Sequence, residues 1–262
     1  MTDEVTFYDE VEAYCARLSC RAGESVGLCV STRHESWSVR VERWGAERDE
    51  VWSASGVTAT YTPAPADADI NGCRWPVSIE IPTDATWRSG FYLVSVTVDD
   101  PSDEVDSDRA TAYAGFVVRS ASADVHARTL LVCATNTWNA YNIWGGKSLY
   151  TGGKEVSFRR PFSRGMLMRP EVDRDDRKAR PHRWGEDHDV DGHLFQEYRH
   201  GAGYPAAIGS TGWFAHERRF VEWAEAGGWQ FDMCVSSDLE NGDCLDGYDL
   251  LIDVGHLSLI HI

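Results

Sequence analysis

Polar and aromatic side chains follow three apolar runs of this chain, at the points where the runs end. The runs lie at 129–135, 229–235 and 248–254, and each has the composition of a buried strand. Because ligands of an open parallel sheet bind outside the carboxyl ends of its strands, we predict that the residues after these runs rim one crevice. They are Asn136, Thr137, Trp138 and Tyr141 after the first run, Ser236 and Asp238 after the second, and Gly255 and His256 after the third.

The stretch 135–150, TNTWNAYNIWGGKSLY, is too rich in large side chains for a plain turn. It holds two Trp, two Tyr, three Asn and a Gly pair in sixteen residues, whereas a turn needs Gly, Asn or Asp but no large rings. Core packing and a functional site both remain open. Tyr141 and Tyr150 are lid aromatics with solvated hydroxyls in the first interpretation, Asp238 caps a turn, and His256 is a hydrogen-bonded histidine at a strand end.

Two further clusters have competing interpretations. A His-rich, acidic segment within 182–200 has ligand-type residues but no HExxH spacing, so a solvated loop is favoured over a metal site. Four arginines suit either an anionic substrate or ion pairs that hold a loop; they are Arg159, Arg160, Arg164 and Arg169. The chain has no GxSxG, GxxxxGK[ST] or helix-opening GxGxxG motif, which argues against a serine hydrolase, a P-loop and a dinucleotide site.

The hydrophobic period changes midway along the chain. Residues 5–119 alternate over short β-branched and aromatic runs with turn signals between them, which predicts an antiparallel sandwich. The only segment there with any helical pattern is EVEAY at 10–14. After a small, polar linker at 120–127, the runs above and a helical stripe at 213–228 give the strand–helix–strand order of a parallel α/β domain.

Composition excludes several classes of function. The net charge of −17, with only 25 basic residues, disfavours binding to nucleic acid or to an anionic membrane. The N-terminus is not a signal peptide, and no run reaches the ~20 apolar residues of a membrane span. The seven cysteines contain no CxxC pair, so we expect free thiols in a reducing cytoplasm.

Ordered motifs in the second half resemble the large (beta) subunit of N,N-dimethylformamidase and its relatives. They are TWNAYN (137–142), KSLY (147–150), SFRRPF (157–162), FVEWAEAGG (220–228), SSDLE (236–240) and YDLLIDVGH (248–256). The first half is similar as well, through AYCARLSCRAGESVGLCVS and ATWRSGFYLV. The resemblance implies an Ig-like β-sandwich over 1–120. An α/β domain with a parallel sheet, of the class I glutamine amidotransferase type, would follow over 128–262.

What the resemblance implies for function is a mononuclear iron amidohydrolase. Such an enzyme cleaves the C–N bond of a small, formamide-type amide with metal-activated water. The Fe(III) ligands carry over to Tyr141 and Tyr150, and the histidine beside the metal carries over to His256. Phenolates are hard oxygen donors that suit a highly charged ion. Four residues would support the ligands from behind: Asn136, Thr137, Asn142 and Asp238.

The tail departs from the family pattern where the third metal ligand belongs. Position 258, where a glutamate is expected, is Ser258, within the apolar LSLIHI. We therefore expect a C-terminally incomplete catalytic domain that is inactive as it stands. The alternative is a non-catalytic, carbohydrate- or protein-binding sandwich joined to an amidotransferase-like domain without its nucleophile. Expected partners are a small amide and either a small second subunit or further copies of the chain.

Overall fold

The computed structural model describes residues 4–5, 7–101, 109–120, 128–169, 204–205, 211–241 and 243–254. Structural statements below concern these residues. Most of the predicted linker, the His-rich segment, Gly255, His256 and Ser258 lie outside them. No helix in the described parts of the chain is long and apolar enough to cross a membrane.

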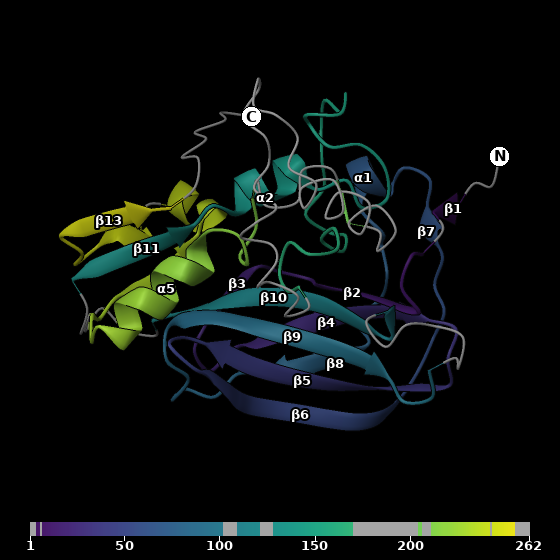
Figure 1. The fold of residues 1–262 in the computed structure, drawn as a ribbon, viewed down its shortest axis with the longest axis horizontal. Coiled ribbons are helices and arrows are strands. Elements are labelled where there is room, and N and C mark those ends of the chain that lie inside the picture. The colour runs from purple at the N-terminus through teal and green to yellow at the C-terminus, as the bar shows by residue number, and fades with distance from the viewer. Residues whose placement is uncertain are drawn as a thin grey trace, which may run out of the picture.

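The first half is mostly β-structure, as predicted. Its elements are β1 (Glu4–Val5), β2 (Val11–Cys15), β3 (Ser19–Arg21), β4 (Ser25–Thr32), β5 (Ser36–Trp44), β6 (Arg48–Thr58), β7 (Ala64–Pro65), α1 (Ala68–Asn71), β8 (Ile79–Pro82), β9 (Gly90–Val98) and β10 (Thr111–Arg119). A five-stranded sheet in the order β3-β10-β9-β5-β6 faces a three-stranded sheet β2-β4-β8 (Figure 1). All pairs are antiparallel except β3 with β10.

The helical interpretation of EVEAY is wrong, because residues 11–14 belong to strand β2. Val11 and Ala13 enter the core between the two sheets. Glu12 lines a cavity and Tyr14 packs in a separate cluster, on the other face of the strand. The alternation of side chains between the two faces of a strand therefore prevails over the short helical pattern. It leaves the carboxyl group of Glu12 buried on the outer face of β2.

The second half contains β11 (Thr129–Cys133), α2 (Thr135–Tyr141), α5 (Glu217–Ala226), β12 (Asp232–Val235) and β13 (Leu250–Asp253). The three strands pair in parallel in the order β12-β11-β13, so their carboxyl ends share one edge as predicted. Two boundaries differ from expectation. Residues 135–141 are helix rather than strand end and loop, and the helix predicted from 213 begins at Glu217.

One hydrophobic cluster joins the two halves of the chain. The outer face of the five-stranded sheet contributes Trp44, Phe91, Leu93 and Val117, and the second half contributes Leu131, Cys133, Trp138, Met166, Leu167, Trp213, Phe214, Val221, Met233 and Val235. The five-stranded sheet is thus covered on both faces, which explains the almost continuous burial of β9. In Figure 1, α5 lies between the parallel sheet and the end of this sheet.

Polar contacts reinforce the same junction. The guanidinium of Arg43, on β5, forms a bidentate ion pair with the carboxylate of Glu225 on α5. The Trp44 indole N–H donates to Glu222 Oε1 at 3.0 Å. Such charge-assisted pairs fix orientation as well as adding stability, so they set the position of α5 against the sandwich.

Candidate functional site

Helix α2 carries Tyr141 and begins directly after β11. The residue at its N-cap position, Ala134, has no side chain that could cap the helix. Glu217 of α5 takes this role: its Oε1 accepts hydrogen bonds from the Ala134 backbone N–H at 3.1 Å and from the Trp138 indole N–H at 2.9 Å. Glu217 is 1% exposed, and burial raises the pKa of its carboxyl group. The hydrogen-bond donors at the start of α2 are therefore satisfied by a residue 83 positions away in the sequence.

The predicted supporting residues of α2 lie where the β11 and β12 ends meet. The Asn136 backbone N–H faces Ser236 Oγ at 3.4 Å, and Ser236 donates to the Cys133 carbonyl at 3.2 Å. Thr137 is buried on the helix. The structure thus brings the residues that follow the first two strands together, as expected from parallel pairing.

Tyr141 and Tyr150 stand face to face. Their ring centroids are 4.1 Å apart with an interplanar angle of 24°. Tyr150 is 65% exposed, and its segment is held to α2 by the Leu149 N–H, which donates to the Ala140 carbonyl at 3.0 Å. Desolvation, followed by the hydrogen bond and charge of Tyr150, raises the pKa of Tyr141. On its own the Tyr141 side chain is therefore a neutral phenol at neutral pH.

Asn142 organises the chain between the two tyrosines. Its Oδ1 accepts hydrogen bonds from the Trp144 N–H at 3.0 Å, the Ser163 N–H at 2.9 Å and the Ser163 hydroxyl at 2.7 Å, while its Nδ2 donates to the Pro161 carbonyl at 2.9 Å. The Ser163 hydroxyl also accepts from the Ile143 N–H at 2.9 Å. Asn142 thus holds a closed hydrogen-bond network at the end of α2. Its support of metal ligands stays a prediction.

Replacing Ser163 by alanine is expected to lower the free energy of unfolding by about 1–2 kcal/mol, because the buried Asn142 side chain and the Ile143 N–H each lose a hydrogen bond. Urea denaturation measures the change. Ser55→Ala, at an exposed position of β6, is the control and should stay within about 0.5 kcal/mol of the parent. An unchanged Ser163→Ala variant would show that the network around Asn142 does not stabilise the fold.

Two of the four arginines hold loops. Arg160 is 1% exposed and donates to the carbonyls of Asn142, Trp144 and Ser157; burial lowers its pKa to about 10. Arg164 pairs with Asp9. The observed contacts of these two arginines are therefore those expected of residues that hold a loop in place.

Asp238 contacts the sandwich. Its carboxylate accepts hydrogen bonds from the Ser19 hydroxyl at 2.7 Å and the Val235 N–H at 2.9 Å, and it lies 3.4 Å from Arg119. It therefore braces β12 against β3 and β10, a contact that the sequence did not predict. Its metal-support role stays a prediction.

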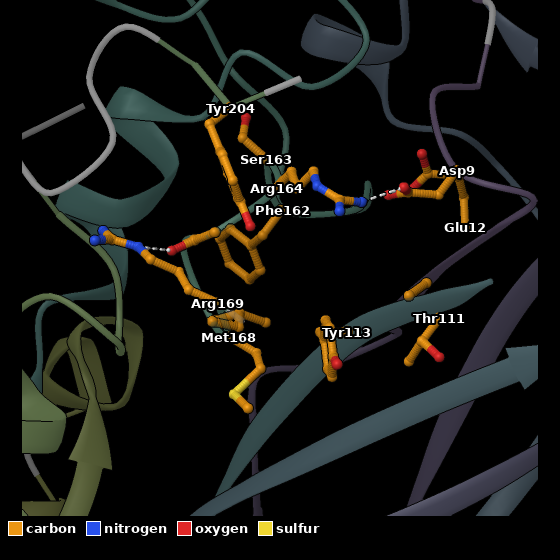
Figure 2. A pocket seen from close by; sticks show the side chains of 13 residues that line it. Asp9, Glu12, Thr111, Tyr113, Phe162, Ser163, Arg164, Met168, Arg169 and Tyr204 are labelled. Atoms are coloured by element: carbon orange, nitrogen blue, oxygen red, sulfur yellow. Dashed lines mark hydrogen bonds and ion pairs between the residues drawn. The ribbon is translucent and has the colours of Figure 1, made fainter. Parts of the chain in front are cut away.

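A cavity that the sequence did not reveal lies on the outer face of β2 and β10 (Figure 2). It has a volume of about 100 Å³. Its wall includes Asp9, Glu12, Thr111, Tyr113, Phe162, Ser163, Arg164, Met168, Arg169 and Tyr204. The sequence signal that could have revealed this cavity is a strand of alternating pattern with a glutamate on its outer face. The helical interpretation of EVEAY obscured this signal. Ser163 connects the cavity wall to the Asn142 network.

Metal-ligating side chains of the usual kinds do not gather in the described parts of the chain: no group of three His, Cys, Asp or Glu could hold an ion there. The adjacent hydroxyls of Tyr141 and Tyr150 are the donors available. Two neighbouring phenol oxygens fit one hard cation, and His256 falls outside the described residues.

The fold and site define a mostly β protein with a parallel three-stranded sheet and a tyrosine pair near its carboxyl edge. The family model for the N,N-dimethylformamidase beta subunit-like, C-terminal region matches residues 38–257, and the chain belongs to this family. No curated protein matches. A solved CARDB domain from Pyrococcus furiosus, in complex with di-metal ions, is similar with 15% identity, covering 44% of this chain and 92% of that one. Its TM-score of 0.23 is too low to support any argument.

Proposed function

We propose that this chain belongs to a metal-dependent amidohydrolase that cleaves the C–N bond of small linear amides. The observation that carries the proposal is the pairing of Tyr141 and Tyr150 beside the carboxyl edge of the parallel sheet. Membership of the dimethylformamidase beta subunit-like family supports it. The family match does not favour a purely carbohydrate- or protein-binding role. We also propose the class I glutamine amidotransferase type for the α/β part, and assembly with a second subunit or further copies.

The tyrosine pair fits Fe(III) on chemical grounds. Because the pKa of Tyr141 is raised rather than lowered, a bound cation is needed to make the phenolates. When bound, the ion supplies Lewis acidity that polarises an amide carbonyl and acidifies water. The chain itself positions the pair, through the Asn142 network below Tyr141 and the hydrogen bond from Leu149 to Ala140.

We further propose that His256 accepts the proton of the attacking water as a general base. It follows β13, whose register places Leu250 beside Thr129 in a parallel pair. The chain therefore leaves β13 at the edge where α2 begins. A neutral imidazole is the usual general base near neutral pH. The third oxygen donor of the family pattern belongs at position 258, where this chain has serine.

The test uses this serine. We expect Ser258→Glu to raise the iron content of the purified chain and to produce a visible tyrosinate-to-iron band. Adding Tyr141→Phe or Tyr150→Phe should weaken the band, because each removes one phenolate, and the two changes together should abolish it. Tyr61→Phe, in the sandwich, is the matched control and should leave the band unchanged. Metal analysis and visible absorption are the measurements.

Release of amine from N,N-dimethylformamide tests the reaction. Turnover is expected in the Ser258→Glu chain and should be lost with His256→Ala while iron is retained. A band that survives both tyrosine changes would contradict the proposal. A band that is lost with Tyr204→Phe but not with Tyr150→Phe would instead move the second ligand to the cavity.

A further inference from the structure

A short segment of the first half of the chain holds the loop 147–157, which carries Tyr150. Helix α1 lies in the connection between β7 and β8, and its Asp69 is 8% exposed. The Asp69 carboxylate accepts a hydrogen bond from the Lys147 backbone N–H at 2.7 Å, and the Asp69 carbonyl accepts one from the Ser157 N–H at 2.8 Å. One residue therefore fastens the loop at both of its ends, on either side of Tyr150.

The residues after α1 strengthen this junction. The Cys73 N–H donates to the Arg159 carbonyl at 2.8 Å. Gly72 has a φ of +76°, and a Cβ built on it would stand 2.8 Å from the same carbonyl oxygen. Burial lowers the pKa of the Arg160 guanidinium to about 10, and the charge of Asp69 is the largest opposing influence. The Asp69 carboxylate therefore interacts with a backbone donor and with a buried cation of the same loop.

Gly146 shows how closely the chain approaches Asp69. Its φ is +153°, and a Cβ built on it would lie 2.5 Å from Asp69 Oδ2. Glycine is the residue that allows such a close approach, because it has no side chain to displace the neighbouring atom. A larger residue at position 146 would push the carboxylate away from the Lys147 N–H. Substitution of Gly146 is therefore an independent way to disturb the same contact.

A compact turn connects Lys147 to the Tyr150 ring. The Ser148 N–H donates to Thr151 Oγ1 at 2.8 Å, and the Ser148 hydroxyl accepts a hydrogen bond from the Tyr150 N–H at 3.2 Å. Ser148 itself is 1% exposed. Because these hydrogen bonds close the turn on itself, it moves as one unit, and an anchor at Lys147 determines where Tyr150 stands.

We propose that Asp69 is a positioning residue for the tyrosine pair: it fixes the turn that places the Tyr150 ring on Tyr141. The other anchor of the turn is its hydrogen bond to the end of α2 at 3.0 Å, about which the turn can pivot when Asp69 does not hold it. The Tyr150 side chain is exposed and has little packing to keep it in place. The anchor at Asp69 therefore decides whether the two rings stay stacked at 4.1 Å.

This inference deepens the proposed metal site, and its chemical meaning rests on the proposed function. In that function two phenolates converge on one hard cation, and a displaced Tyr150 would leave the cation with one of them. Residues that orient metal ligands typically change metal affinity about 10–100-fold when they are replaced. The stacking of the two rings depends on the contacts above and not on iron, so it can be measured separately.

Photo-oxidation to dityrosine measures the stacking in the metal-free chain. A ruthenium tris-bipyridyl complex with persulfate removes one electron and one proton from each ring, and a carbon–carbon bond then joins adjacent rings. Trypsin cleaves after Lys147, so a crosslink of Tyr141 with Tyr150 joins two peptides that mass spectrometry identifies. Asp69→Ala and Gly146→Ala should each lower the yield of this crosslink at least about threefold, because a lost hydrogen bond to a carboxylate shifts the equilibrium of the turn by that factor or more.

Two further variants separate positioning from charge and from general stability. Asp69→Asn removes the charge but keeps an oxygen that accepts from Lys147, so it should retain more than about half of the parent yield. Asp67→Ala is the matched control, because the Asp67 carboxylate contacts Asn71 and Arg74 of its own segment; its yield should equal that of the parent. Thermal unfolding of each variant establishes that the crosslink is measured in a folded chain.

The tyrosinate-to-iron band gives a second readout. In the Ser258→Glu chain at limiting iron, Asp69→Ala should weaken the band about tenfold, and Asp69→Asn should restore most of it. Equal crosslink yields in Asp69→Ala and the parent, or an equal loss in Asp67→Ala, would overturn the positioning role. A crosslink that depends on Asp69 in a chain that forms no band would contradict the iron proposal alone and support the positioning role.

Discussion

Replacing Trp213 by alanine is expected to lower the free energy of unfolding by about 3–5 kcal/mol. Trp213 is fully buried in the cluster that joins the sandwich to the parallel sheet. Its ring stacks on Phe91 of β9 at a centroid distance of 4.0 Å and meets the edge of Trp44 of β5 at 6.1 Å. Alanine would leave a cavity against both halves, so both should lose stability in one transition.

Two variants control this result. Trp213→Phe keeps a ring in place, and the indole N–H that it removes has no acceptor among the described residues, so the loss should stay below about 1.5 kcal/mol. Trp223→Ala removes a ring of α5 that is 64% exposed and should change stability by about 0.5 kcal/mol or less.

Urea denaturation followed by circular dichroism and by tryptophan fluorescence measures the three variants. Coincident shifts of both signals in Trp213→Ala would show that the shared cluster couples the halves. Separate transitions, with the sandwich unaffected, would show instead that the predicted division near residue 120 separates independent folding units and that the cluster contributes little.

The parallel sheet could be predicted because its signals are local. Each of its strands is a short apolar run, and parallel pairing follows from the helix between the first two runs. Helix α2 could not be predicted in the same way. Its seven residues include threonine and asparagine, which are weak helix formers, and its start depends on Glu217, far along the chain. Long-range hydrogen bonding, rather than propensity, makes residues 135–141 helical.

The candidate site shows the same limit. The closeness of Tyr141 and Tyr150 was expected from the resemblance, but the Asn142–Ser163 network that shapes their segment spans 21 residues and has no sequence signature. The ion pair of Asp9 with Arg164 joins residues 155 positions apart. A buried acid such as Glu12 is also hard to recognise, because acidic residues in strands are usually solvated.

Glu12→Gln is expected to stabilise the chain without a ligand, and increasingly so as the pH rises. The folded state raises the pKa of this buried carboxyl group from 4.5 to about 8, so the unfolded chain releases a proton that the folded chain keeps. The stability of the parent should therefore fall as the pH rises from about 4.5 to 8. Each pKa unit corresponds to about 1.4 kcal/mol.

At pH 7 this penalty is on the order of 3 kcal/mol, and at pH 5 it is below about 1 kcal/mol. Glutamine has nearly the same shape, still accepts a hydrogen bond from Trp144 and carries no proton to release, so the variant avoids the penalty. Denaturation of both chains at pH 5, 6, 7 and 8 isolates the contribution of Glu12, because every other titrating group is common to them.

The difference between the two chains should grow across this series. Glu50→Gln removes the same charge at an exposed position of β6 and should show no such growth. A stability difference that is constant with pH, or a variant less stable than the parent at pH 8, would mean that Glu12 is ionised in the folded chain and already has a counter-ion.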